Sequence, residues 1–206
     1  MAPNKFDIHR TPGQKPGLNQ GDTPSDLSNI NTNVPKRQLE GAMLTFDSFV
    51  RNGKYFGVEA VGKHLVSTDM SFGDEEDKPD VPDDKNKHSR MKFAANIDVS
   101  KDMCNKFGIM HGACVAYLMD TVTTGALVSL EGPPRVSLSL NISFYRPIPV
   151  GSKIRLVAYT TSVGRSIAHT RGEMWDLKKS TLLASCTHTM VDPKSDNPPP
   201  IAKSKL

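Results

Sequence analysis

The stretch Asn105–Asp120, which reads NKFGIMHGACVAYLMD, decides how the rest of this chain is interpreted. It holds three side chains that can take part in catalysis, those of Asn105, His111 and Asp120. The run Gly-Ile-Met-His-Gly-Ala within it is typical of a turn that opens into a helix. The stretch therefore predicts either a chemical site at the start of a helix or only a capped core helix.

A long helix is predicted over residues 111–130. Apolar side chains recur near one of its faces, at Val115, Leu118, Val122 and Ala126. The run Glu131-Gly132-Pro133-Pro134 ends the pattern, as glycine and proline should. Small residues such as Gly112 and Gly125 allow a helix to lie very close to a sheet.

Most of the remaining chain is predicted to form strands. Apolar side chains at helical spacing predict a first helix over residues 36–51. Strands are predicted over the segments 54–72, 91–99, 136–144, 154–158, 167–177 and 182–191. In the first of these, Gly57 and Gly62 indicate a bulge or close packing. Because short turns join the later strands, we expect an α+β fold with an antiparallel sheet of about six strands against one long helix.

Composition divides the chain into one domain and two tails. The 206 residues suit a single domain with residues left over. Residues 1–36 are rich in Pro, Gly, Asn, Ser and Asp and predict a disordered N-terminal tail, and residues 193–206 predict a flexible C-terminal tail. The domain is therefore expected over residues 37–192. Within it, the acidic segment 73–88 predicts a solvated surface loop.

Charge and cysteine content exclude several classes of protein. A net charge of +4 with well-mixed signs is too mild to indicate nucleic acid or an anionic membrane as partner. The sequence contains no apolar run long enough to span a bilayer. The three cysteines lack CxxC spacing, which favours a reduced compartment and argues against a disulfide framework or a zinc site. The N-terminus lacks the features of a secretory signal.

The tripeptide Ser204-Lys205-Leu206 matches the peroxisomal import signal. We therefore expect a peroxisomal import receptor among the partners and a peroxisomal location, with the cytoplasm as the alternative.

The element order and the central stretch resemble the hotdog-fold acyl-CoA thioesterases, in particular the phenylacetate-degradation-type (4-hydroxybenzoyl-CoA thioesterase-like) branch. The resemblance covers roughly residues 40–192. It is carried, at the spacing of that branch, by Asn105, Gly108, His111-Gly112, Asp120, Val136-Ser137, Asn141–Tyr145 and Pro147–Gly151. The chain departs from the family at Ala113, where a second glycine is usual.

This resemblance implies an enzyme that hydrolyses acyl-CoA to free acid and CoA without a metal or an organic cofactor. The N–H of Gly112, at the helix start, would polarise the thioester carbonyl, and Asp120 would act as base or nucleophile. Asp120 lies about 13 Å of helix rise beyond His111, so one chain cannot bring both to the same carbonyl. In the family the acid comes from a second subunit, which implies a homo-oligomer, either a dimer or a dimer of dimers.

The resemblance also gives roles to other residues. Asn105 would hold the attacking water or position its loop, Ser137 would bond the water or the leaving group, and His111 would polarise the carbonyl or cap the helix. Substrate-binding candidates are Gly108 and the basic side chains of Arg146, Arg165 and Lys178, which lie near predicted strand ends or turns where CoA phosphates could bind.

Simpler interpretations stay open for several of these residues. His111 can be only a helix cap, Asn105 a turn residue and Ser137 an ordinary strand residue. Asp120 is harder to explain in this way, because a carboxylate buried in an apolar helix is costly unless it is paired or functional. A nucleophilic cysteine at Cys104 or Cys114 is disfavoured, because neither has a histidine–acid pair nearby in the sequence.

Two other functions remain possible on the same fold. One is a hydratase or dehydratase acting on enoyl-CoA, and the other is a non-catalytic acyl-CoA-binding protein. The acid nine residues after His111 favours hydrolysis over the first. The intact set of candidate residues argues against the second.

Overall fold

The computed structural model describes residues 26–51, 55–72, 90–130 and 135–193. Its elements, in chain order, are η1 (Leu27–Asn29), β1 (Asn31–Thr32), α1 (Lys36–Val50), η2 (Gly62–His64), β2 (Val66–Phe72), β3 (Met91–Asp98), η5 (Lys101–Met103), α2 (Gly112–Val128), β4 (Val136–Phe144), β5 (Lys153–Val163), β6 (Ile167–Asp176) and β7 (Thr181–Val191).

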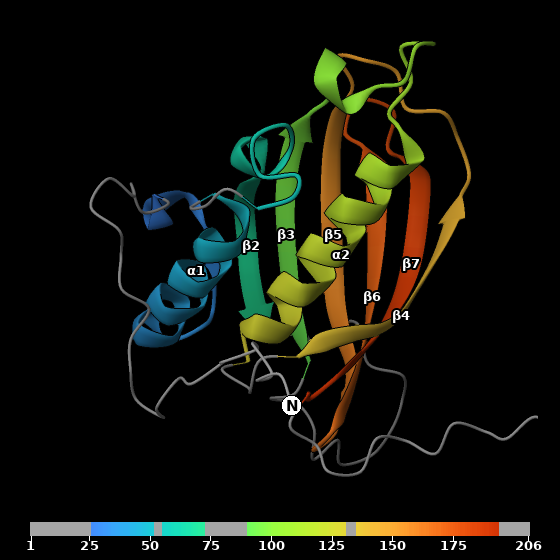
Figure 1. Ribbon diagram of the computed structural model, residues 1–206. Coiled ribbons are helices and arrows are strands. Elements are labelled where there is room, and N and C mark those ends of the chain that lie inside the picture. The colour runs from blue at the N-terminus through green and yellow to red at the C-terminus, as the bar shows by residue number, and fades with distance from the viewer. Residues whose placement is uncertain (1–25, 52–54, 73–89, 131–134, 194–206) are drawn as a thin grey trace, which may run out of the picture.

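The strands form one seven-stranded sheet in the order β1-β2-β3-β5-β6-β7-β4. The long helix α2 lies across one face of this sheet, and α1 lies beside it on the side of β2 (Figure 1). The two-residue strand β1 pairs in parallel with β2, and every other pairing is antiparallel. The predicted fold class is confirmed, with seven strands in place of about six because β1 was not expected.

The helix α2 begins where the sequence indicates. His111 has an extended backbone, and its Nδ1 accepts a hydrogen bond of 3.1 Å from the N–H of Ala113, which caps the first turn. Farther along, a Cβ added to Gly125 would lie 2.9 Å from the Phe46 ring and 3.1 Å from the Phe93 ring. The small residue therefore lets α2, α1 and the sheet approach one another at this point.

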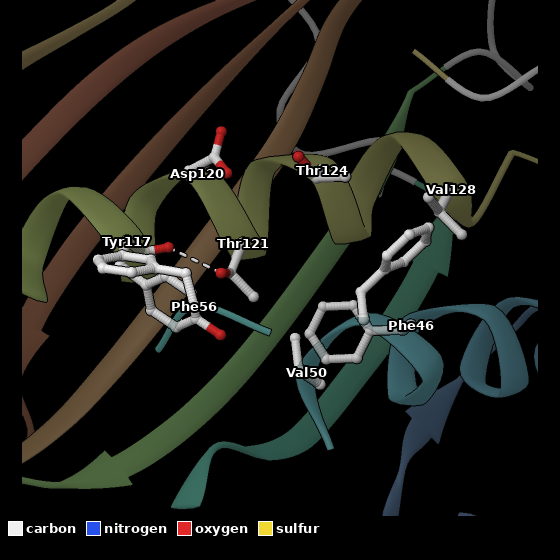
Figure 2. A pocket seen from close by; sticks show the side chains of 9 residues that line it. Phe46, Val50, Phe56, Tyr117, Asp120, Thr121, Thr124 and Val128 are labelled. Carbon is white, nitrogen blue, oxygen red and sulfur yellow. Dashed lines mark hydrogen bonds between the residues drawn. The ribbon is translucent and has the colours of Figure 1, made fainter. Parts of the chain in front are cut away.

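The face of α2 that is turned toward α1 differs from the face packed on the sheet. Tyr117, Thr121 and Val128 project from α2 on the same side as Phe46 and Val50 of α1, and a pocket lies between them (Figure 2). This side of the helix is therefore less tightly filled than the sheet side.

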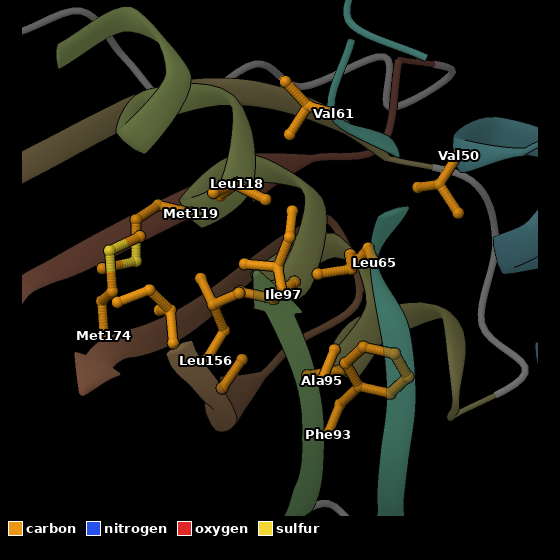
Figure 3. Packing of buried hydrophobic residues seen from close by; sticks show 14 of the residues in the cluster. Val50, Val61, Leu65, Phe93, Ala95, Ile97, Leu118, Met119, Leu156 and Met174 are labelled. Atoms are coloured by element: carbon orange, nitrogen blue, oxygen red, sulfur yellow. The ribbon is translucent and has the colours of Figure 1, made fainter. Parts of the chain in front are cut away.

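The hydrophobic core lies between α2 and the sheet. Leu118 and Met119 of α2 are fully buried in one cluster with Ile97, Leu156 and Met174 from the strands (Figure 3). The packing of these side chains fixes the rotation of α2, and with it the direction in which Asp120 points.

The strand predicted over residues 54–72 is wrong in its first half. Only Val66–Phe72 forms a strand, while residues 56–61 are turns and Gly62–His64 is a short helix. Gly57 has a φ of +76°, which ends any extended run, and a Cβ there would meet the Tyr117 ring at 2.6 Å. The predicted close packing at this glycine is therefore present, in a turn that lies against α2.

The N-terminal tail was predicted to be disordered up to residue 36, and this is wrong for its last residues. Residues 27–32 form η1 and β1, and Ile30 and Val34 are buried in the core. The Asn31 amide donates to the Asp69 carboxylate at 3.2 Å, which fixes β1 to β2. Burial of these two apolar side chains holds the otherwise polar segment against the domain. The average composition of residues 1–36 does not reveal them.

Several predictions lie outside the described residues. These are the disorder of residues 1–25, the acidic loop, nearly all of the C-terminal tail and the import signal Ser204-Lys205-Leu206, which stays a prediction. Among the helices that are described, none is long and apolar enough to cross a membrane.

Candidate active site

Asp120, near the middle of α2, is held by Ser137 of the edge strand β4. The Ser137 hydroxyl donates to Asp120 Oδ1 across 3.0 Å. The Asp120 side chain is 45% exposed in the single chain, so the expectation of a buried carboxylate is wrong for one copy of the protein. The acid is oriented by a hydrogen bond and still reachable, as a group that acts on a substrate must be.

His188 of β7 lies directly behind this pair. Its Nε2 is 3.0 Å from Ser137 Oγ and 3.5 Å from Asp120 Oδ1, and its side chain is 0% exposed. On the far side of the ring, Nδ1 lies 2.7 Å from Thr123 Oγ1. Burial lowers the pKa of His188, and the Asp120 charge opposes that shift in part, so the ring is neutral near pH 7.

A neutral ring has one N–H, and the hydrogen bonds indicate where it lies. Because Ser137 gives its proton to Asp120, Nε2 of His188 must donate to the Ser137 oxygen. The Thr123 hydroxyl donates to the Met119 carbonyl oxygen at 2.7 Å, and its oxygen lies 2.7 Å from Nδ1 on the far side of the ring. Nε2 of His188 and the Ser137 hydroxyl both donate in the direction of Asp120, so these two hydrogen bonds stabilise its charged form.

His188 was not among the residues predicted from the sequence. It belongs to the inward face of β7, where Ala184, Cys186 and Met190 are also buried. The sequence did offer one indication of a functional residue here, namely a histidine at a position of the strand where apolar side chains are expected to face the core. Its partners Ser137 and Thr123 come from distant parts of the chain, so sequence spacing alone could not connect them.

The start of α2 holds the second group of predicted residues. His111 uses Nδ1 to cap the helix, which is one of the two roles predicted for it. The N–H of Gly112 has no hydrogen-bond partner within the described residues, and this glycine is exposed. A Cβ at Gly112 would lie 3.8 Å from the Phe144 ring, which is ordinary contact, so the packing of this chain does not require a glycine here.

The loop before α2 is built by Asn105 and Gly108. Asn105 Oδ1 accepts from the N–H groups of Phe107 at 2.9 Å and Ile109 at 3.4 Å. Gly108 has a φ of +72°, and a Cβ added there would have no atom within 4 Å. The turn therefore favours glycine because of its left-handed backbone conformation, and not because a larger side chain would clash. Of the roles predicted for Asn105, positioning of the loop is the one that these contacts show.

The structure separates the predicted residues into two groups. Gly112 and Asp120 belong to one continuous helix, so about 12 Å of helix rise lies between them. One chain therefore places an exposed helix N–H at one point and an oriented acid at another.

The basic residues predicted to bind substrate do not form one rim in a single chain. Arg165 lies in the turn before β6 and Lys178 in the turn after it, at opposite ends of a strand about 33 Å long. Arg146 follows β4, and its Nη1 donates to the Leu182 carbonyl at 2.9 Å. In the described part of the chain, no cluster of three or more His, Cys, Asp or Glu residues is placed to hold a metal ion.

Comparison with known proteins agrees with this geometry. The family model described as the thioesterase superfamily matches residues 107–182. Mouse acyl-coenzyme A thioesterase 13 is 30% identical to this chain over 99 residues, which are 48% of this chain and 71% of that protein. The chain belongs to the thioesterase superfamily.

Solved structures of this superfamily share the fold. The zebrafish thioesterase superfamily member 2 has a TM-score of 0.55 at 21% identity, over 71% of this chain and 93% of that one. The mouse member 2 has a TM-score of 0.51 at 24% identity, over 66% and 87% of the two chains. These structures confirm the fold, and together with the family match and the mouse relative the resemblance to hotdog thioesterases and the prediction of a thioester hydrolase are confirmed.

The cysteines of this thioesterase-superfamily chain are poor nucleophiles. Burial raises the pKa of the Cys114 thiol to about 11, with a contribution from nearby Cys104, and burial likewise raises the pKa of Cys186 to about 11. A thiol with such a pKa carries almost no thiolate at neutral pH. This agrees with the sequence analysis, which disfavours a cysteine nucleophile.

Proposed function

We propose that this protein hydrolyses acyl-CoA thioesters to the free acid and CoA, in active sites that two copies of the chain complete together. The observation that carries the proposal is the exposed Asp120 carboxylate, oriented by Ser137 and His188, on the helix whose start offers the Gly112 N–H, which is exposed and has no partner among the described residues. The similarity to a mouse protein named as an acyl-coenzyme A thioesterase supports CoA esters as the substrate class.

The edge strand β4 supports assembly into a dimer. Among the described strands it pairs only with β7, its sequence VSLSLNISF carries no charge, and Leu138 is 53% exposed. Natural proteins protect long apolar edges, or use them to pair with another chain. Pairing of β4 with β4 of a second copy would place the two α2 helices near each other, because Ser137 of β4 contacts Asp120 of α2.

In such a dimer the chemistry divides between the copies. The Gly112 N–H of one copy donates to the thioester oxygen, and it stabilises the negative charge that forms there during attack. Asp120 of the other copy takes a proton from water while the water oxygen bonds to the carbonyl carbon. When the carbonyl re-forms, the carbon–sulfur bond breaks and the proton passes from Asp120 to the CoA sulfur.

Asp120 can also be the nucleophile: its carboxylate oxygen bonds to the acyl carbon to form an anhydride, the carbon–sulfur bond breaks, and the CoA thiolate takes a proton from water. A single turnover in water labelled with heavy oxygen tests the second route. Label in Asp120 requires attack of water on the aspartyl carbon of the anhydride, whereas direct attack of water on the thioester leaves Asp120 unlabelled and places the label in the product acid.

Ser137 and His188 are positioning residues in this account. Ser137 fixes one oxygen of Asp120, and His188, which is buried, fixes Ser137. Neither needs to touch the substrate, because their effect is to hold the carboxylate in one orientation before the substrate arrives.

The test is release of free CoA from a panel of acyl-CoA esters, followed with a thiol reagent. The purified protein should release CoA, Asp120→Ala should lose at least about 100-fold in kcat, and Asp98→Ala, an exposed aspartate on β3, should match the wild type. Absence of CoA release above background would overturn the proposal. Loss of enoyl-CoA absorbance without thiol release would favour a hydratase instead.

A further inference from the structure

A pocket of about 170 Å³ lies between α1 and the side of α2 that faces away from the sheet (Figure 2). Its walls come mainly from aromatic and aliphatic side chains, among them Phe46 and Val50 of α1 and Phe56 before η2. Asp120 is part of the same lining. The acid that Ser137 orients on one side therefore borders an apolar pocket on the other.

We propose that this pocket receives the acyl group of the substrate and selects uncharged, apolar acyl groups of up to about six carbon atoms beyond the thioester carbonyl. The inference rests on the proposed function, which brings the reacting carbonyl to Asp120. An acyl group attached to that carbonyl then begins where the pocket begins.

The charge of the pocket excludes acyl groups that end in a carboxylate. Its described lining contains no Lys, Arg or His, and its one acid is Asp120. Burial raises the pKa of the Tyr117 hydroxyl, with a further contribution from the Asp120 charge, so this phenol stays neutral. A second carboxylate would lose its hydration without finding a cation here.

The volume of the pocket sets the length. A cavity of about 150 Å³ lined by apolar side chains takes up benzene, a molecule of six carbons. Each methylene moved from water into such a site improves binding about fourfold. We therefore expect kcat/KM to rise steeply from a two-carbon acyl group toward a group that fills the pocket, and then to stop rising.

The size of the pocket favours an acyl group over a segment of another protein chain as its occupant. Phe56 is 83% exposed and Phe49 is 54% exposed, yet the space between them and α2 has the size of a small organic group. Phe56 stacks edge-on against Tyr117 with ring centroids 5.9 Å apart, which keeps one wall in place. A second copy of the chain covering this mouth is the competing occupant, and it would leave the acyl-length profile insensitive to the pocket residues.

The experiment measures kcat/KM for acetyl-, butyryl-, hexanoyl-, octanoyl- and dodecanoyl-CoA, with adipoyl-CoA as the charged counterpart of hexanoyl-CoA. We expect hexanoyl-CoA to exceed acetyl-CoA by at least about 30-fold, dodecanoyl-CoA to bring no further gain, and adipoyl-CoA to fall near acetyl-CoA. A continued rise to dodecanoyl-CoA, or equal use of adipoyl- and hexanoyl-CoA, overturns the inference.

Variants connect the profile to this pocket. Thr124→Phe fills the space from α2 and should reduce kcat/KM for hexanoyl-CoA at least about tenfold more than for acetyl-CoA. Thr161→Phe, an exposed threonine on β5, is the matched control and should keep the wild-type profile. A wild-type profile in folded Thr124→Phe overturns the inference but leaves the proposed function standing.

If Thr124→Phe does not fold, Phe49→Ala decides instead. Phe49 is largely exposed, so its removal opens one wall without disturbing the core, and it should reduce the preference for hexanoyl- over acetyl-CoA about fourfold or more. An unchanged preference overturns the inference. Failure of every protein and every ester to release CoA refutes the proposed function itself.

Discussion

Ser137 on β4 donates a hydrogen bond to Asp120 on α2 across 3.0 Å, and this contact links the edge strand of the sheet to the central helix. His188 lies 3.0 Å behind Ser137 and is entirely buried. The same contact places the proposed acid next to the strand that we expect to form the dimer interface. In the proposed mechanism, catalysis and assembly would therefore depend on neighbouring residues of β4.

Removal of the Ser137 hydroxyl should slow catalysis without preventing binding. A hydrogen bond to a charged group is worth about 1.5–3 kcal/mol, so Ser137→Ala should lower kcat roughly 10- to 100-fold with little change in KM. Ser137→Thr keeps a hydroxyl and should recover much of the rate. Ser139→Ala, on an exposed serine of the same strand, is the control and should have no effect. Full activity in Ser137→Ala would show that Asp120 does not need this partner.

The ring of His188 should titrate below the ordinary histidine value of 6.5, because burial lowers its pKa. The Asp120 charge opposes this shift, so Asp120→Asn should lower the pKa further. NMR titration of the His188 ring resonances in the two proteins tests both statements. A pKa at or above 6.5, or a rise in Asp120→Asn, would contradict the arrangement.

The same shift makes stability depend on pH. As pH falls below 6.5, the unfolded chain binds a proton at His188 before the folded protein does. The free energy of unfolding should therefore decrease between pH 6.5 and the lower folded-state pKa, by up to about 1.4 kcal/mol per pH unit. Urea denaturation of the wild type and His188→Gln measures this, and the variant should show the shallower dependence.

Two glycines of α2 should differ in how strongly their replacement by alanine changes stability. A Cβ at Gly125 would lie 2.9 Å from the Phe46 ring, which itself packs against Phe93 with centroids 4.7 Å apart. Gly125→Ala should therefore lower the free energy of unfolding by about 1–3 kcal/mol, despite the higher helix propensity of alanine. Gly112→Ala meets only ordinary contact and should change stability by less than about 0.5 kcal/mol. Chemical denaturation checks both predictions. If Gly125→Ala were as stable as Gly112→Ala, the side chains around Gly125 would be able to move aside at little cost.

A charge on the β4 edge should separate the copies. Leu138 is 53% exposed, so Leu138→Lys should leave the single chain folded while it prevents two edges from pairing. Size-exclusion chromatography with light scattering should show a monomer with little activity. Leu177→Lys, on an exposed leucine after β6, should keep the wild-type mass and rate. An active dimer carrying Leu138→Lys would place the interface elsewhere.

Local patterns predicted most of the fold. Strict alternation over residues 136–144 and the turn at Gly108 through His111 are visible in the sequence, and both are where they were expected. The turns around Gly57 were missed because this glycine packs against the Tyr117 ring, a contact with a distant part of the chain. The attachment of β1 was missed for the same reason, since its partner is β2.

The site was predicted in part. Asp120, Ser137, His111 and Gly112 were named from a resemblance, and the structure places the first two in contact. His188 is 51 residues after Ser137 and is joined to it only because β4 pairs with β7. Residue types indicate which side chains can react, whereas strand pairing decides which of them meet.

Mixing two inactive variants tests the shared active site most directly. Gly112→Pro removes the N–H, yet proline is favoured at the first position of a helix and His111 before it is already extended, with ψ of 137°. Asp120→Ala removes the acid in the other chain. Each variant alone should be inactive. After the two are unfolded and refolded together, roughly one quarter of the wild-type activity should return, because half of the dimers are mixed and each mixed dimer regains one of its two sites. If the mixture stays inactive while size measurements show mixed dimers, Gly112 and Asp120 do not serve the same site from two chains, and the account is wrong.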